Sequence, residues 1–390
     1  MPGHHLPDKA AIDRLIARMG GGPGMGSLES GTAPLSQADR LEASERALRK
    51  RLERHPGTRH DEAVRRLIRD ARNGFARLAT EGRLARLSAS EFFALEAVVE
   101  TDGSRPALFV QDGTISLADD ELSGPGSLWV GPAAYFLPDI ENVIASVGAV
   151  KKAGEDWVYG TAFMIAPEIA VTNRHVLEGI AALHDDTWVF HSPVDIDFLH
   201  EYDRPGQQVF RVAEAIFAGE GPIFGAVNFA NLDLALLRLE GDGDFPAPLK
   251  CAATPALQDN AIQVIGFPSS VKIQADTEDP TIAPMPRHEY QSVVADLFPD
   301  ALGFKRWSPG RLLHLPGSLP GDDKQWVIAH DASTLGGNSG SAIVDFSTDG
   351  GCVLALHFGG VSRILNYGLM FDRFRDVLQQ QVPLPAPNST

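Results

Sequence analysis

Gly-Gly-Asn-Ser-Gly-Ser, at residues 336–341, is the most informative stretch of this 390-residue sequence. The small residues on both sides of Ser339 predict a tight backbone turn that exposes one hydroxyl and lets a carbonyl group approach the main chain. Backbone N–H groups in such a turn can point at an oxygen that becomes negatively charged during a reaction. A serine between glycines is usually only part of a loop, so the interpretation depends on the rest of the chain.

Two further motifs supply the partners that a reactive serine needs. Thr-Asn-Arg-His-Val at 172–176 places His175 directly after a short apolar strand, and Asn-Leu-Asp-Leu-Ala-Leu-Leu at 231–237 places Asp233 at the start of a buried one. A serine hydroxyl is a poor nucleophile until a base takes its proton, and the base needs a third group to hold its ring. We therefore predict a catalytic triad of His175, Asp233 and Ser339, with an oxyanion hole formed by the backbone N–H groups of Gly337 and Ser339.

The order His, Asp, Ser and the residues around each member resemble the trypsin-like, chymotrypsin-fold serine peptidases. Thr172-Asn-Arg-His-Val and Ser333-Thr-Leu-Gly-Gly-Asn-Ser-Gly-Ser are most similar to the bacterial V8-like glutamyl endopeptidase branch. The resemblance covers roughly 140–375 and says nothing about 1–130. It implies a mainly β fold of two six-stranded antiparallel barrels with the active site between them. The implied activity is that of a serine endopeptidase, a hydrolase that cleaves peptide bonds through an acyl-enzyme without a cofactor.

The same resemblance suggests where a substrate would bind. In the V8-like branch, a threonine and a histidine at the positions of Thr334 and His357 help to bind an acidic side chain at P1, the residue before the cleaved bond. An acidic P1 and a small or apolar P1 both remain open from the sequence. The edge formed by Phe358, Gly359 and Gly360 is expected to pair with an extended substrate backbone. Asn338 cannot form the ion pair with a new N-terminus that activates animal trypsins, so activation by that route is not expected.

Charge and composition limit the kinds of partner that the protein is expected to bind. The net charge is −17, but residues 36–90 hold 14 Lys+Arg against 8 Asp+Glu, and residues 91–390 hold 17 against 40. The basic segment is either a solvated helical face or a surface for an acidic protein partner. It lacks interleaved aromatic residues, so nucleic-acid binding is not predicted. No group of His, Asp or Glu has the spacing of metal ligands, and we predict no metal site.

The sequence also indicates a compartment. It shows no secretory signal and no apolar run of the roughly 20 residues that span a bilayer, so we predict no membrane association. Cys251 and Cys352 are its only cysteines, too few for a secreted disulfide framework, and are expected to be buried thiols. These features predict a cytoplasmic, bacterial protein.

Patterning along the chain predicts the domain organisation. Helical periodicity begins at Ser36, resumes at Thr58 after Pro56-Gly57, and begins again at Ser88, where Ser88 and Glu91 match a capping box. We predict a flexible N-terminal segment (1–35), a helical module (36–100), a connector (101–137) with β-like pieces at 107–110 and 127–130, a peptidase domain (138–380) and a tail (382–390). The first barrel would span about 140–245, the second about 250–370, and a C-terminal helix 371–381.

Short apolar runs between turn residues predict many short strands, as in an all-β barrel or sandwich. They lie at 142–150, 157–165, 169–172, 188–191, 208–217, 234–239, 261–266, 302–306, 326–330, 341–345 and 352–357. The long, proline-rich segment 270–325 is expected to be a loop. The helical module would regulate the peptidase or recruit a protein partner. The competing hypothesis is a latent or inactive protease-fold protein that serves as a binding scaffold.

Overall fold

The computed structural model describes most of the chain from Ser104 onward and part of the residues before it. The described residues are 58–81, 104–155, 157–204, 206–223, 229–268, 303–319, 321–334, 338–347, 351–362 and 365–384, with scattered positions between 38 and 49 and between 87 and 94. The predicted segment 1–35, residues 269–302, Gly337 and the end of the tail lie outside them.

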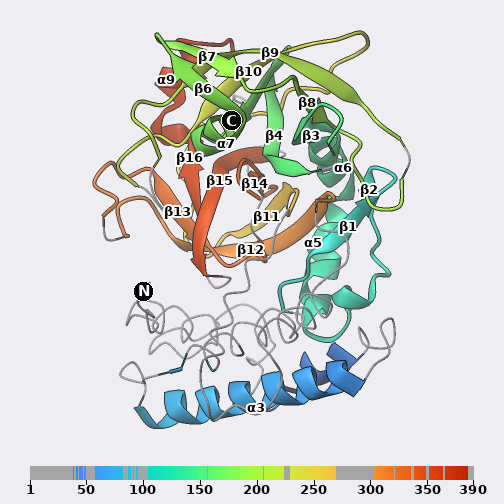
Figure 1. Ribbon diagram of the computed structural model, residues 1–390. Helices are drawn as coiled ribbons and strands as arrows, with labels where there is room; N and C mark the ends of the chain where they lie inside the picture. The colour runs from blue at the N-terminus through green and yellow to red at the C-terminus, as the bar shows by residue number, and fades with distance from the viewer. Residues whose placement is uncertain are drawn as a thin grey trace.

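The first barrel is a closed, six-stranded antiparallel sheet in the order β10-β5-β4-β3-β8-β9. Its strands are β3 (Val147–Lys152), β4 (Val158–Ala166), β5 (Ile169–Thr172), β8 (Val194–Asp197), β9 (Val209–Ala218) and β10 (Ala235–Glu240). Helix α7 (Arg174–Ile180) and the hairpin of β6 (Ala181–His184) and β7 (Thr187–Phe190) lie between β5 and β8. The barrel occupies the upper part of Figure 1.

The second barrel is also six-stranded and runs in the order β11-β14-β15-β16-β13-β12, closed by pairing of β11 with β12. Its strands are β11 (Ala261–Gly266), β12 (Arg306–His314), β13 (Val327–His330), β14 (Ala342–Asp345), β15 (Cys352–Ser362) and β16 (Leu365–Met370). The predicted mainly β fold with two six-stranded antiparallel barrels is therefore confirmed. Closure pairs both edges of each sheet, which removes the exposed edges of an open sheet.

The stretch predicted as a surface connector contributes two strands to the second sheet. Strand β1 (Leu108–Gln111) pairs with Arg306 and Trp307 at the start of β12, and β2 (Thr114–Ile115) pairs with β1 (Figure 1). Leu108, Val110 and Ile115 are buried. The prediction of a β-like piece at 127–130 is wrong. Three helical elements follow β2, namely η2 (Asp120–Leu122), the 3₁₀ helix η3 (Gly124–Trp129) and α5 (Val130–Tyr135). A proline at the start of η3 favours this helical turn.

Three other predicted elements differ from the observed ones. Helix α6 (Leu137–Ser146) replaces the first half of the strand expected at 142–150, because Ile140, Val143 and Ile144 recur at helical spacing and are buried. Strand β12 lies at 306–314 rather than 302–306, with Pro309 and Gly310 inside it, so the segment 270–325 is not wholly a loop. The C-terminal helix is broken into η4 (Phe371–Arg373) and α9 (Arg375–Gln379). Strands β6, β8 and β16 were not predicted.

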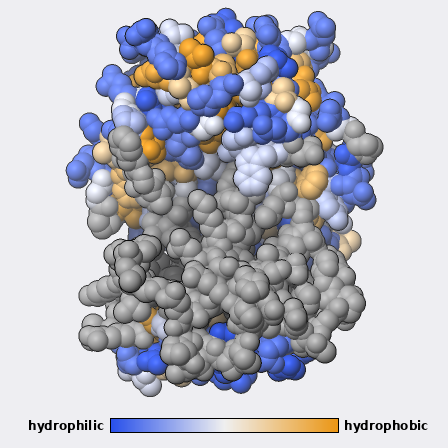
Figure 2. Space-filling model, in the orientation of Figure 1, coloured by the Kyte–Doolittle hydropathy of each residue, from blue (hydrophilic) through white to orange (hydrophobic). Residues whose placement is uncertain are grey.

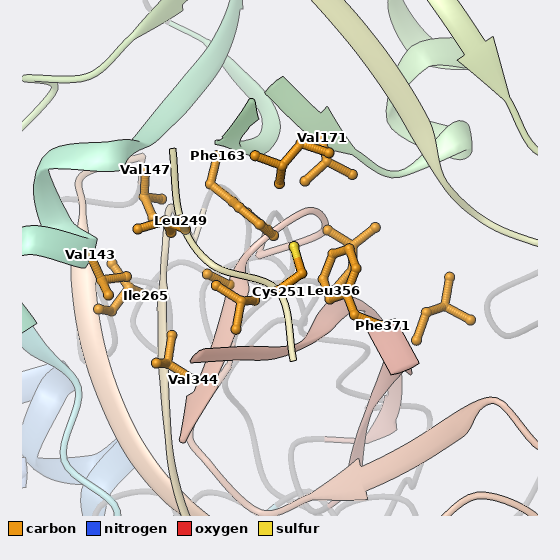
Figure 3. Close-up of a cluster of buried hydrophobic side chains, with 14 of the residues drawn as sticks. Val143, Val147, Phe163, Val171, Leu249, Cys251, Ile265, Val344, Leu356 and Phe371 are labelled. Carbon is orange, nitrogen blue, oxygen red and sulfur yellow. The ribbon is translucent and has the colours of Figure 1, made fainter. Parts of the chain in front are cut away.

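A large apolar core joins the two barrels. Figure 3 shows Phe163 and Val171 of the first barrel lying above Ile265, Val344 and Leu356 of the second. The segment that links the barrels passes between them through Leu249 and Cys251, which belong to the same core. Both cysteines are buried and free, as expected, and burial raises the pKa of Cys251 to about 12. The core fixes the barrels against each other and thereby fixes the cleft between them.

A fully buried lysine ties the barrels together at one further point. Lys305, just before β12, donates from Nζ to the carbonyl oxygens of Ile144 (2.8 Å) and Phe198 (2.7 Å). These carbonyls belong to the end of α6 and to the segment after β8. Burial lowers the pKa of Lys305 to about 8, while the carboxylates of Glu201 and Asp197 oppose that shift. The buried ammonium is retained because its protons have acceptors from two segments and carboxylates lie nearby.

The helical module begins as predicted in two places. Helix α3 (Thr58–Glu81) starts after Pro56-Gly57, and the stripe expected on it is buried, with members Ala63, Leu67, Ile68, Ala71, Phe75 and Leu78. Ser88 and Glu91 form the predicted capping box, since the Ser88 N–H donates to the Glu91 carboxylate (2.8 Å) and the Glu91 N–H to the Ser88 hydroxyl (3.2 Å). Of the earlier helix, Ala38, Leu41 and Leu48 are helical. Leu52 lies outside the described residues.

Over the barrels, the face shown in Figure 2 carries apolar groups scattered among hydrophilic side chains. Among the described helices, none has the length and apolar character to cross a membrane.

Candidate active site

His175 and Asp233 form a partly buried pair in the first barrel. The imidazole Nδ1 lies 2.6 Å from Asp233 Oδ2, and the backbone N–H of His175 donates to Asp233 Oδ1 at 2.9 Å. The Asp233 residue is 1% exposed, whereas a third of the His175 side chain is open. An ionised carboxylate only accepts hydrogen bonds, so Nδ1 carries the proton and Nε2 is left as the basic nitrogen.

The local sequence explains why these two residues meet. Strand β5 ends at Thr172 and pairs with Ala235 of β10, so the residues that follow β5 and those that precede β10 lie at the same end of the barrel. Asn173 strengthens the junction by donating its side-chain amide to the Asp233 carbonyl (2.8 Å). Helix α7 then begins at Arg174 and turns the His175 backbone N–H toward the carboxylate.

Ser339 lies in the turn between β13 and β14, against the first barrel. Its carbonyl accepts a hydrogen bond from the Thr161 N–H of β4 (2.7 Å). A side chain built on Gly160 would come within 3.1 Å of the Ser339 carbonyl oxygen and 2.7 Å of Val176, the residue after His175. Ser339 and the His175 segment are therefore neighbours on the surface of β4.

Gly340 is the residue that makes this approach feasible. Its φ is +89°, and an ideal Cβ would lie 1.8 Å from the Thr161 carbonyl oxygen and 2.7 Å from Thr172 Oγ1. Only glycine tolerates both the left-handed backbone and the contact. Thr172 Oγ1 also donates to the Thr161 carbonyl (2.6 Å), so one carbonyl joins the strand before His175 to the turn of Ser339.

The remaining hydrogen bonds of the turn connect it to β15. The Gly340 N–H donates to the His357 carbonyl (2.8 Å), and the His357 N–H donates to the Ser341 carbonyl (3.0 Å). Ser341 in turn donates from its backbone N–H to the Asn338 carbonyl (2.8 Å). His357 is thus held beside the serine turn, as the sequence pattern suggested, while Gly337 of the predicted oxyanion hole lies outside the described residues.

His357 is a neutral imidazole in this environment. It is fully buried, its Nδ1 lies 3.3 Å from His330 Nε2, and burial together with the neighbouring His330 and His175 holds its pKa well below the usual value. One of the two facing nitrogens must accept while the other donates, so the pair binds a single shared proton between them. Thr334 is also buried, and its hydroxyl has no hydrogen-bond partner within the described part of the chain.

The predicted substrate edge extends beyond its neighbour in the sheet. Strand β15 pairs with β16 as far as Ser362, whereas its pairing with β14 ends at Leu356. Beyond His357, the side of β15 that faces away from β16 has no strand partner among the described elements. Gly359 and Gly360 lie on this stretch, while the Phe358 ring is buried and packs with Tyr367 and Phe229. Phe358 can therefore offer its backbone but not an exposed ring.

Sequence reasoning missed the residues that place the motifs relative to each other. Thr161 and Thr172 contact the serine turn from the first barrel, and His330 supports His357 from β13. A threonine or histidine inside a strand gives no signal of its own, because its partner is distant in the sequence. Within the described residues, no group of three or more His, Cys, Asp or Glu side chains has the arrangement of a metal site.

Comparison with known proteins agrees with this geometry. Residues 160–356 match the trypsin-like peptidase domain, and the chain belongs to that family. It is 32% identical over 375 residues to a "Probable serine protease" of Lysobacter enzymogenes, an alignment that covers 90% of this chain and 91% of the relative. The protein is a serine-type peptidase, a hydrolase whose substrates are peptides or proteins.

Solved structures with a related fold include two forms of the Rv3671c protease. The inactive form covers 64% of this chain and 95% of that chain at 20% sequence identity, with a TM-score of 0.38. The active form, from M. tuberculosis, covers 66% and 89% at the same identity and TM-score.

Proposed function

We propose that this peptidase is an endopeptidase that works through an acyl-enzyme, with Ser339 as nucleophile, His175 as general base and Asp233 as the residue that orients His175. The observation that carries the proposal is the two-point contact between Asp233 and His175, at 2.6 and 2.9 Å, beside the turn of Ser339. Two contacts fix both the tautomer and the ring orientation of His175, which a base needs before it can accept a proton.

The chemistry follows from these positions. Ser339 Oγ attacks the carbonyl carbon of the substrate while its proton passes to His175 Nε2. The carbonyl π electrons move to the oxygen, which becomes an oxyanion, and the backbone N–H groups of Gly337 and Ser339 are proposed to bind it. When the intermediate collapses, the C–N bond breaks and the amine leaves with the proton from Nε2. Water then repeats the sequence on the ester and releases the acid and free Ser339.

Labelling with a fluorophosphonate, followed by mass spectrometry of the digested protein, tests the nucleophile directly. The expected result is a single stoichiometric adduct on the peptide that contains Ser339, together with loss of peptidase activity. An adduct on another serine would overturn the assignment. A protein that neither reacts with the probe nor cleaves peptides would instead support the competing role of a latent or inactive scaffold.

We also propose that the pocket beside Ser339 selects uncharged P1 side chains at neutral pH. Thr334 offers a buried hydroxyl that has no partner among the described residues, and His357 offers a neutral imidazole, because burial holds its pKa well below the usual value. A carboxylate that enters such a pocket loses water without meeting a positive charge, which is unfavourable. This property sets the chain apart from the glutamyl endopeptidase branch that its motifs resemble.

Matched peptides that differ only in Gln or Glu at P1 test this selectivity across pH. At pH 8 we expect a larger kcat/KM for the Gln peptide. As the pH falls through the usual histidine range, His357 should stay neutral, because burial holds its pKa well below the usual value, and the preference for Gln should persist. The ratio of the two kcat/KM values cancels any effect of pH that is common to both peptides. A preference for Glu that is already strong at pH 8 would contradict a neutral pocket and favour V8-like specificity.

The helical module is proposed to bind a protein partner or to regulate the peptidase. Its support is the basic composition of 36–90 and the exposed arginine side chains of α3, such as Arg65 and Arg69. These charges would attract an acidic surface.

A further inference from the structure

We infer that Arg105 is a positioning residue for the peptidase site, because it holds the segment Asp331–Thr334. This segment carries Thr334 of the proposed P1 pocket and is called the substrate wall below. The inference rests on the proposed function and deepens it, because it assigns to the N-terminal part of the chain a specific contact with the substrate-binding segment. Arg105 lies more than 200 residues before this segment, in the stretch that leads into β1.

The contact is a two-point ion pair that is mostly removed from solvent. Arg105 Nε donates to Asp331 Oδ1 at 2.9 Å, and Nη2 donates to Oδ2 at 2.5 Å. The two side chains are 16% and 6% exposed. A planar guanidinium that binds both oxygens of a carboxylate fixes the orientation as well as the distance of its partner. A lysine at position 105 could supply the charge but not this geometry.

Further hydrogen bonds hold both sides of the pair. The Ser333 hydroxyl donates to the carbonyl of Arg105 (2.8 Å), so the two chain segments are joined by backbone as well as by side chains. Arg105 Nη1 and the Trp129 indole N–H both donate to the Ser104 carbonyl, and the guanidinium lies 5.4 Å from the Trp129 ring centre. Arg105 is therefore pre-oriented by its own segment before it meets Asp331.

The position of Asp331 in the sheet explains how Arg105, just before β1, can contact the end of β13. On one edge of β12, β13 pairs with Leu312 and His314, and β1 pairs with Arg306 and Trp307 (Figure 1). Asp331 lies at the gap between these two neighbours, where two hydrogen bonds join it to the backbone of Arg311. The Arg311 N–H donates to Asp331 Oδ1 (2.7 Å), and the Asp331 N–H donates to the Arg311 carbonyl (3.2 Å).

After Asp331 the chain leaves the sheet and leads to the turn of Ser339. His330, the last residue of β13, contacts His357, and Thr334 carries the buried hydroxyl without a partner in the described part of the chain. On the other side, Asn366 of β16 donates to the Ala332 carbonyl (2.9 Å). Arg105 and Asn366 thus hold the segment from opposite sides. The residues that they hold lie between His330 and Thr334.

Loss of the guanidinium would leave the Asp331 carboxylate buried without its cation. The segment would then have to shift toward water, and Thr334 would shift with it. Displacement of a binding group by about 1 Å can cost on the order of 100-fold in rate. A role limited to general stability would instead lower the melting temperature without changing how the enzyme discriminates among P1 side chains.

The experiment uses the full chain with Arg105→Met and Arg105→Lys, and with Arg211→Met as control. Arg211 forms an equally short ion pair with Asp195 at 2.5 Å, in the first barrel and away from Asp331. For each variant, kcat and KM are measured on two peptides that differ in Gln or Gly at P1, together with the melting temperature. The assays are repeated with millimolar guanidinium, which is far too dilute to denature a protein.

We expect Arg105→Met to lose roughly 10- to 100-fold in kcat/KM on the Gln peptide and clearly less on the Gly peptide, whose P1 has no side chain for the wall to contact. Guanidinium should restore part of the loss in Arg105→Met and none in the control. If Arg105→Met does not fold, Arg105→Lys decides: a lower Gln-to-Gly ratio than the parent supports the inference. A folded variant with the parent's ratio, or an equal loss on both peptides without rescue, overturns it. A failure of the proposed function can be told apart from a failure of this inference. In that case the parent protein itself would not be labelled at Ser339 by the fluorophosphonate.

Discussion

Ser339→Ala should reduce kcat on a fluorogenic peptide by about 10⁶-fold, the order of loss found when the nucleophile of a Ser-His-Asp triad is removed. The reason is that, without the Ser339 hydroxyl, hydrolysis would have to proceed by direct addition of water. Fluorophosphonate labelling should disappear in the same variant. The half-buried Ser339 side chain loses one oxygen, and we expect the melting temperature to stay close to that of the parent.

Ser318→Ala is a suitable control for this change. The Ser318 hydroxyl donates to the Leu315 carbonyl in an exposed turn of the second barrel (2.6 Å), so its loss should leave activity unchanged. The nucleophile assignment fails if Ser339→Ala retains labelling or a kcat within tenfold of the parent.

Asp233→Asn is expected to lower kcat by about 10⁴-fold, the loss that this change causes in the Ser-His-Asp template. The His175 backbone N–H needs an acceptor, so the amide oxygen should take the place of Oδ1. The amide nitrogen would then face Nδ1 and donate to it. Such a histidine carries its proton on Nε2 and cannot accept the proton of Ser339. The KM should change little, because Asp233 is buried away from the substrate.

Asp195→Asn provides the matched change for comparison, since Asp195 also accepts from a cationic side chain in the first barrel but lies outside the site. Its kcat should equal that of the parent. If Asp233→Asn were as active as Asp195→Asn, the carboxylate would be a structural group and His175 would have to be oriented by another residue.

The motifs alone were enough to propose the parts of the candidate site. Short stretches around His175, Asp233 and Ser339 each carry local signals, namely a strand end, the start of a buried run and a glycine turn. The capping box at Ser88 and the apolar stripe of α3 could be predicted for the same reason, because both depend on residues three or four apart. The short apolar runs likewise predicted an all-β barrel or sandwich, and the resemblance of the motifs to a peptidase family narrowed this to two barrels.

Local signals failed where distant segments decided the conformation. Strand β12 contains Pro309 and Gly310, which favour turns, yet Gln263 of β11 pairs opposite Pro309 and β1 pairs nearby. The stretch 101–137 has the composition of a connector, but Leu108 and Val110 are buried because β12 offers an edge for them. Residues 142–146 became the end of α6 rather than a strand, since burial of one helical face outweighed their β-branched composition.

The sequence by itself indicated the class of protein, because three motifs in a fixed order predict a nucleophile, a base and an orienting carboxylate. The tertiary structure decided what surrounds them. Three contacts act across chain separations of 27 to 226 residues: the Thr161 carbonyl leaves room only for glycine at 340, His330 contacts His357, and Arg105 binds Asp331. Such contacts depend on how the barrels close and pack, and no local pattern encodes them.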